Sequence, residues 1–159
     1  WERITVEEAF NRYAKIPAKE ALKSDLFDEV MVQGIEPRLG IKKPAFIYDY
    51  PAECRSLARL KKEDPAVAER FELYIGGLEI ANAFSELIDT EEQRKVFHVE
   101  AEVRRSLGKP IYPMPEKFLD ELEDLPPSAG IALGVDRLVM VLLNAEKIDE
   151  VVAFTPEEL

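Results

Sequence analysis

The stretch of sequence that decides the fold is residues 70–87, which read RFELYIGGLEIANAFSEL. Two runs in which apolar and polar residues alternate meet at a Gly-Gly pair, and a two-residue glycine turn between such runs is typical of a β-hairpin. In that hairpin Tyr74 lies opposite Glu79, which puts Glu72 diagonally opposite Glu79 on the same face. The stretch therefore predicts an antiparallel pair of strands with two carboxylates on one face.

The second strand of this hairpin carries two further polar residues, Asn82 and Glu86. In a regular strand Asn82 lies on the opposite pleat from Glu79 and Glu86, whereas a bulge near residues 81–82 would bring all three side chains together. A solvated strand face is the alternative for any one of these glutamates. Converging carboxylates repel each other, so a shared site would need a divalent cation such as Mg²⁺ or a cationic ligand.

The chain on both sides of the hairpin shows patterns for several helices and a few more strands. Helices are expected over residues 5–14, 25–33, 90–107, 116–125 and 137–143, strands over residues 45–50, 129–135 and 151–154, and an extended segment over residues 53–59. No repeat and no Gly/Ser linker divides the chain. A hairpin followed by helices and one late strand is an α+β order and not an alternating βαβ order.

Residues 130–137, GIALGVDR, form a second segment with a chemical signal. Glycines inside a strand allow a ligand to approach the backbone closely. Arg137 begins an apolar helix that we expect to be buried, and an arginine fixed in this way can direct its guanidinium at a phosphate. A salt bridge with Asp136 is the alternative. The glycines lie within the strand and no Gly-Lys-Ser/Thr follows, so neither a Rossmann nor a Walker pattern is present.

Composition limits the class of protein. The chain has 159 residues with 21 Lys and Arg against 32 Asp and Glu, a net charge of −11. This is the length of one domain, and so acidic a chain is not expected to coat nucleic acid. The single cysteine, Cys54, excludes an internal disulfide framework and predicts a reducing, cytoplasmic setting. No apolar run approaches the roughly 18 residues of a membrane span, so no membrane partner is expected.

These segments resemble a known family. Residues 130–137, followed by Leu-Val-Met, resemble motif 3 of the class II aminoacyl-tRNA synthetases, and residues 71–87 are similar to the lysyl branch of that class. Within the branch the chain resembles the paralogues that attach (R)-β-lysine to elongation factor P, because Ala132 stands where lysyl-tRNA synthetases carry glycine. The resemblance implies that residues 1–159 are the C-terminal segment of a catalytic domain, an antiparallel sheet flanked by helices, with motifs 1 and 2 absent.

The resemblance also implies roles for single residues. Arg137 would be the catalytic residue on the γ-phosphate of ATP, and Glu72 and Glu79 would hold Mg²⁺ and ATP. Glu86 would hold the ε-ammonium group of the substrate. The residues implied around the substrate amino acid are Glu79, Asn82, Phe84, Glu86, Gly130, Ala132 and Gly134.

The implied activity is the ATP- and Mg²⁺-dependent activation of lysine or β-lysine as an aminoacyl-adenylate, with transfer to elongation factor P, in a full-length homodimer. One alternative is a true lysyl-tRNA synthetase with tRNA as the acceptor. The other is a non-catalytic module that keeps the fold. We expect the isolated 159-residue chain to be inactive, because it carries no arginine of the motif 2 type for the α-phosphate.

Overall fold

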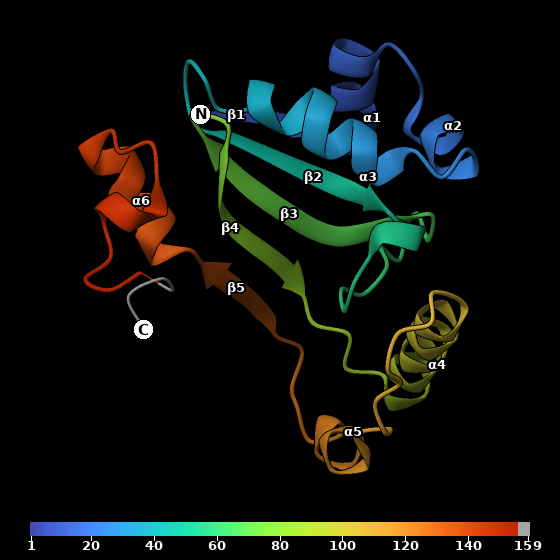
Figure 1. The fold of residues 1–159 in the computed structure, drawn as a ribbon. Coiled ribbons are helices and arrows are strands. Elements are labelled where there is room, and N and C mark those ends of the chain that lie inside the picture. Colours follow the sequence, from blue (N-terminus) through green and yellow to red (C-terminus); the bar gives the residue numbers. More distant parts are fainter. Residues whose placement is uncertain (156–159) are drawn as a thin grey trace.

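The structure is a computed structural model that describes residues 1–155. Its centre is a five-stranded sheet in the order β1-β2-β3-β4-β5 (Figure 1). The strands are β1 (Glu2–Thr5), β2 (Ala45–Pro51), β3 (Val67–Ile75), β4 (Leu78–Ser85) and β5 (Ala129–Leu133). β1 pairs with β2 in parallel and the other pairs are antiparallel. The expected α+β class is confirmed, but the sheet is mixed, so the expectation of an antiparallel sheet is wrong at this edge.

β1 is the strand that the sequence pattern missed. Its four residues run straight into a helix, which leaves too few positions to show alternation. The chain passes through the helical residues 6–38 before it returns as β2, and a crossover of this kind is what joins two parallel strands. Ile4 of β1 lies opposite Ile47 of β2 and both are buried, so β1 contributes core as well as an edge.

The helical segments largely follow the sequence pattern. Those before β2 are α1 (Val6–Ala9), η1 (Phe10–Ala14), α2 (Ala18–Lys23), α3 (Phe27–Glu29), η2 (Val30–Ile35) and η3 (Glu36–Arg38). Those after it are η4 (Ala52–Cys54), α4 (Thr90–Ser106), α5 (Glu116–Leu122), α6 (Val135–Leu143) and η5 (Ile148–Glu150). Thr5 caps the first helix through reciprocal hydrogen bonds with Glu8. None of the helices within residues 1–155 is long and apolar enough to cross a membrane.

Three local expectations are wrong. The helix expected over residues 25–33 is present, but it begins at Phe27 and runs through residue 35, so its expected bounds are wrong by two residues at each end. Residues 53–59 contain the end of η4, turns and one isolated β-bridge from Ala58 to Glu86, and residues 151–154 are turns and bends without a strand. Residues 53–59 contain no β-branched or aromatic residue, and residues 151–154 are too few to show a clear alternation.

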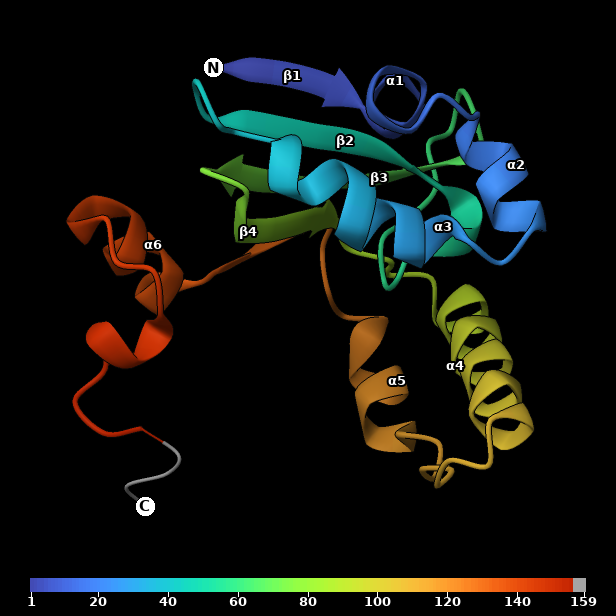
Figure 2. The same ribbon diagram turned by 45° about the horizontal axis from the view of Figure 1, so that its top comes forward.

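The helices from residue 6 to residue 38 lie against one face of the first three strands (Figure 2). Ile4, Ile47 and Tyr74 project from the sheet into this core. The rings of Phe10 and Phe27 stack there with centroids 4.8 Å apart. In the strand registers Ile47 lies directly opposite Glu72, so the core and the carboxylates of the hairpin share one face of the sheet.

The remaining helices stand away from this core. α4 and α5 extend from the far end of the sheet, and α6 follows β5 on the other side (Figures 1 and 2). The expectation that α6 is buried is wrong for this chain. Val135 is 60% exposed and Leu142 is 74% exposed, and Met140 is the buried residue of the helix. The part of the chain described here places little against the apolar side of α6.

Candidate active site

A β-bulge at Ile80 decides which side chains share the site. Tyr74 pairs with Glu79 as predicted, but Leu73 then pairs with Ala81, which leaves Ile80 as an extra residue. Asn82 therefore lies directly opposite Glu72. The hypothesis that a bulge brings the polar residues of this strand together is confirmed, one residue earlier than the expected position.

β5 extends the same face. Ala132 lies opposite Asn82, and Gly130 lies opposite Phe84. Alternation along the strands puts these residues on the side of the sheet that carries Glu72. The members of this face are Glu72, Glu79, Asn82, Phe84, Glu86, Gly130 and Ala132.

The site residues line three cavities. One of about 320 Å³ is lined by Glu79, Asn82, Ala132, Gly134 and Arg137, among others. Glu72 lines a cavity of about 400 Å³, which it shares with Glu36, Tyr50 and Arg70. Phe84 and Gly130 also border a third cavity, of about 270 Å³, whose other walls come largely from the opposite face of the sheet, among them Tyr48, Phe71 and Ala83. The structure thus places most of the expected residues along β4 and β5, from Glu79 beside the hairpin turn to Glu86 just past the other end of β4, and Glu72 lies next to Asn82 on β3.

Glu72 is buried, and its carboxylate is fully hydrogen-bonded. Arg70 donates from Nη2 to Oε1 at 2.7 Å, and Asn82 donates from Nδ2 to the same oxygen at 2.9 Å. The hydroxyls of Tyr50 and Tyr74 donate to Oε2 at 2.6 and 2.9 Å. A carboxylate can be buried at low cost only when its charge is paired and its oxygens are bonded in this way.

The two tyrosines remain protonated donors over the working pH range. Burial, and then the charge of Glu72, raises the pKa of the Tyr50 and Tyr74 hydroxyls far above the usual range. The guanidinium of Arg70 also lies 4.3 Å from the ring centroid of Tyr50 and donates to the carbonyl of Cys54 at 2.8 Å. Glu72 is therefore held by a rigid group of donors.

Arg137 reaches back across the cavity to β4. Its Nη1 donates to the carbonyl oxygen of Glu79 at 3.0 Å and lies 3.4 Å from Oε2 of the same residue. The salt bridge considered with Asp136 is not the one that forms. The Arg137 side chain is 50% exposed, so much of its guanidinium faces the open side of the cavity, where a phosphate could accept from it.

Glu86 and Gly130 fit each other closely. A Cβ placed on Gly130 would lie 2.4 Å from Oε1 of Glu86, so the carboxylate of Glu86 occupies the space that a side chain at position 130 would fill. Glu86 is half-buried and forms no ion pair with any residue of 1–155. A half-buried carboxylate without an internal cation is suited to receive an ammonium group.

The two carboxylates expected to bind a divalent cation, Glu72 and Glu79, differ in how accessible their oxygens are. Glu79 is 35% exposed and its carboxylate has only the long contact to Arg137, so its oxygens are accessible. Glu72 has no oxygen without a donor. No group of three or more acidic, histidine or cysteine side chains within residues 1–155 is arranged to hold a metal ion by itself. Mg²⁺ prefers one or two carboxylates together with substrate phosphates, so Glu79 meets that requirement as it stands.

Sequence reasoning missed four members of this group: Glu36, Tyr50, Arg70 and Tyr74. Tyr74 could have been found, because it lies two residues from Glu72 and so on the same face. Glu36 gave no signal, because its segment looked like an ordinary loop and only the folded chain brings it to the hairpin.

Comparisons with known proteins agree on one family. The family described as tRNA synthetases class II (D, K and N) matches residues 1–158. The elongation factor P–(R)-β-lysine ligase of Proteus mirabilis (strain HI4320) is 46% identical over 142 residues, which cover 89% of this chain and 44% of that protein. The ligase of the same name from Photorhabdus laumondii is 40% identical over 177 aligned positions. That alignment covers 97% of this chain and 54% of the relative. The chain spans about half the length of the curated relatives it matches.

Proposed function

Because this chain belongs to the class II tRNA synthetases (D, K and N), we propose that it is the C-terminal catalytic segment, residues 1–159, of a ligase that activates lysine or β-lysine with ATP. The acceptor in this proposal is elongation factor P, which the names of the two relatives give as the protein that they modify. The observation that carries the proposal is the single face on which Glu79, Asn82, Ala132 and Arg137 surround one cavity.

Each residue has a part that follows from its surroundings. Arg137 would offer its open guanidinium to the γ-phosphate, and Glu79 would hold the Mg²⁺ of the nucleotide. Glu72 is the second ligand that the resemblance implies, and it would have to exchange one of its four donors for the ion. Bound Mg²⁺ would neutralise phosphate charge. Glu86 binds the ε-ammonium group of the amino acid beside Phe84 and Gly130, and Asn82, Ala132 and Gly134 line the pocket. Positioning and charge stabilisation are the catalysis here, since the substrate carboxylate is itself the nucleophile.

The wider setting of the proposal is a cytoplasmic homodimer of the longer ligase. The single cysteine, Cys54, supports a reducing compartment, and burial raises the pKa of its thiol to about 11, so it is not a reactive thiolate. A true lysyl-tRNA synthetase and a non-catalytic module are the alternatives. The identities of 40–46% to elongation factor P ligases favour neither.

We expect the ligase that carries this chain to prefer β-lysine over α-lysine, and Ala132→Gly to narrow that preference by at most about 3 kcal/mol. The Ala132 methyl group lies opposite Asn82 on the pocket face, where it takes the room that an α-amino acid needs for its amine-bearing carbon. The measurement is amino-acid-dependent ATP–pyrophosphate exchange, expressed as the kcat/KM ratio for the two substrates. The 159-residue chain alone should show no exchange.

Ala129→Gly is the matched control, because Ala129 lies on the same strand but on the opposite face and does not line the cavity of Ala132 and Arg137. It should leave the preference unchanged. A preference for α-lysine that Ala132→Gly does not alter would assign the protein to the tRNA synthetases, and robust exchange by the 159-residue chain would contradict the need for a further segment.

Gly130→Ala should raise the KM for the amino acid about tenfold or more with little change in stability. The added Cβ would meet Oε1 of Glu86 at 2.4 Å, and that carboxylate is the end of a flexible side chain that can swing away. A carboxylate displaced by even 1 Å no longer matches the substrate ammonium. Steady-state kinetics gives the KM, and urea unfolding gives the stability.

Gly34→Ala is the control for the added methyl group, because Gly34 lies in η2 with only a 4.0 Å contact to Val30. If Gly130→Ala changes neither KM nor the preference for a cationic side chain, Glu86 belongs to a solvated strand face.

A further inference from the structure

The amide of Asn82 is held between two charged side chains of β3. Arg70 donates from Nε to Oδ1 of Asn82 at 3.3 Å, and the Nδ2 group of Asn82 donates to Oε1 of Glu72 at 2.9 Å. Arg70 also donates from Nη2 to the same Oε1 at 2.7 Å. The three side chains therefore close a ring of hydrogen bonds on the face of the sheet that carries the site.

The chemistry of these two neighbours decides which way the amide faces. A guanidinium can only donate hydrogen bonds, and an ionised carboxylate can only accept them. The oxygen and the NH₂ group of an amide are nearly equal in size, so shape alone does not choose between its two orientations. If the Asn82 amide turned over, its NH₂ group would face Arg70 and its oxygen would face Glu72, so both bonds would be lost.

Arg70 is itself fixed on every side. Its Nη1 donates to the carbonyl oxygen of Cys54 at 2.8 Å, and its guanidinium lies 4.3 Å from the ring centroid of Tyr50. Only 17% of the Arg70 side chain is exposed. Together with the bonds to Asn82 and Glu72, each of the three nitrogens of the guanidinium has an acceptor. The group is therefore held in one orientation, and it can impose that orientation on Asn82.

Asn82 reaches the substrate pocket and Arg70 does not. Asn82 lines the cavity of Ala132, Gly134 and Arg137, whereas Arg70 lines the cavity of Glu72 instead. One N–H of the Asn82 amide goes to Glu72 and one lone pair of its oxygen goes to Arg70. A ligand is left with the second N–H and the second lone pair, each in a fixed direction. Turning the amide over would exchange this donor for this acceptor.

We propose that Arg70 is a positioning residue for the substrate amino acid, which together with Glu72 locks the amide of Asn82 so that its free donor and acceptor face fixed directions in the pocket. Arg70 acts through Asn82 and needs no contact with the substrate. This inference rests on the proposed function, in which Asn82 lines the amino-acid pocket.

The test is a double-mutant cycle on the KM for β-lysine and the KM for ATP in the ligase that carries this chain. Arg70→Lys keeps the positive charge beside Glu72, but one ammonium group lacks the forked geometry that reaches three acceptors at once. The KM for β-lysine should rise about tenfold, because a misdirected group loses its contact with the substrate. The KM for ATP should change much less. In an Asn82→Ala background Arg70→Lys should have no further effect.

NMR detects the same lock without catalysis. The side-chain amide signals of Asn82 in the ligase are identified by their absence in Asn82→Ala. In Arg70→Lys these signals should shift, and their protons should exchange faster with water, because the amide has lost one of its two fixed partners.

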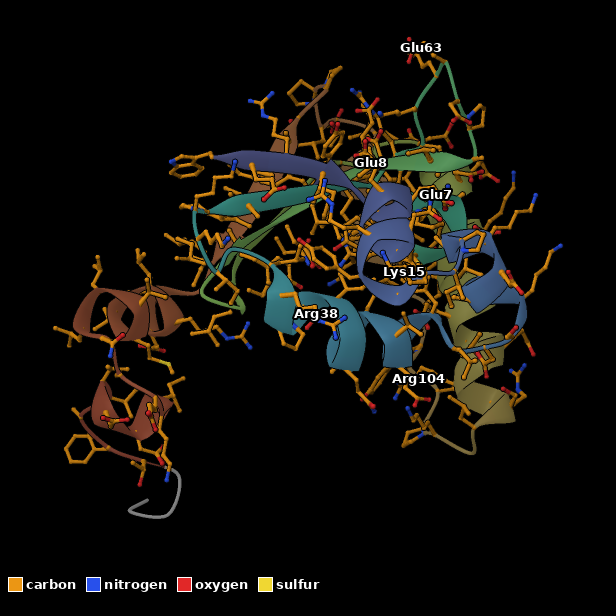
Figure 3. All side chains as sticks on the ribbon, turned by 90° about the horizontal axis from the view of Figure 1, so that it is seen from above. Glu7, Glu8, Lys15, Arg38, Glu63 and Arg104 are labelled. Carbon is orange, nitrogen blue, oxygen red and sulfur yellow. The ribbon has the colours of Figure 1, made fainter. Side chains whose placement is uncertain are left out.

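Arg104→Lys is the matched control. Arg104 of α4 (labelled in Figure 3) also lies over a tyrosine ring, 4.5 Å from the centroid of Tyr112, and also donates to a backbone carbonyl, that of Pro110, at 2.7 Å. Both of these partners lie outside the site. Arg104→Lys should therefore leave the two KM values and the Asn82 signals unchanged.

An equal rise in the KM for β-lysine from Arg70→Lys with and without Asn82 would overturn the inference while the proposed function stands. A wild-type ligase that activates neither lysine nor β-lysine would overturn the proposed function, and this inference with it. Urea unfolding identifies any variant that does not fold. If Arg70→Lys does not fold, the Nε–H signal of Arg70 carries the test. It should exchange faster with water in Asn82→Ala, and an unchanged rate would overturn the inference.

Discussion

Replacing Gly40 with alanine should lower the free energy of unfolding of this chain by about 3 kcal/mol or more. Gly40 has a φ of +72°, a conformation that L-residues adopt only with strain. An added Cβ would also lie 2.4 Å from the carbonyl oxygen of Tyr74 and 2.6 Å from its carbonyl carbon. Backbone atoms in a sheet cannot move aside as a flexible side chain can, so the clash adds to the strain. Urea unfolding of the 159-residue chain measures the loss.

Gly76→Ala is the control that separates the two causes. Gly76 has a similar φ of +63°, but a Cβ there would meet nothing within 4 Å. It should therefore cost only the conformational strain, about 1 kcal/mol. Equal losses from the two variants would show that η3 is not pressed against the hairpin as the structure places it.

Arg137→Ala in the ligase that carries this chain should reduce kcat/KM for ATP by about 30-fold or more, equivalent to about 2 kcal/mol. The guanidinium is anchored by the carbonyl of Glu79 and opens onto the cavity, so its loss would leave a phosphate without its partner. The ion pair with Glu79 is long and half-exposed, and such pairs contribute little to stability. Unfolding should therefore change little while ATP use falls.

Arg137→Lys is the matched variant, because it keeps the charge but loses the forked donor geometry, and it should recover only part of the activity. If Arg137→Ala lowers the stability and leaves the dependence on ATP unchanged, Arg137 only links α6 to β4 and does not bind a phosphate.

The hairpin could be predicted from sequence because two local signals agree there. A Gly-Gly pair with φ of +63° and +81° makes the turn, and alternation fixes the pairing of Tyr74 with Glu79. The site could be predicted to the extent that it lies on those strands. The exact place of the bulge could not, because Ile80 and Ala81 are both small to medium apolar residues that fit either position.

The errors share one physical cause, which is dependence on contacts distant in sequence. β1 is a strand because β2 lies beside it, and Glu36 joins the site because the hairpin turn binds the backbone after it. α6 has the composition of a core helix, yet packing decides burial, and little of residues 1–155 packs on it. Local pattern carries none of this information.

The bulge at Ile80 also limits how portable this site is. Asn82 and Phe84 of β4 lie on the face of Glu79 only because one extra residue interrupts the pairing. Deleting Ile80 would restore an uninterrupted register and exchange the two faces of the strand from that point on. Asn82, Phe84 and Glu86 therefore cannot be moved to another hairpin as a working site by themselves. In a regular hairpin that lacks the extra residue Ile80, the same three side chains would point away from Glu79. Such a protein would have the same residues at these positions but not the geometry of the site.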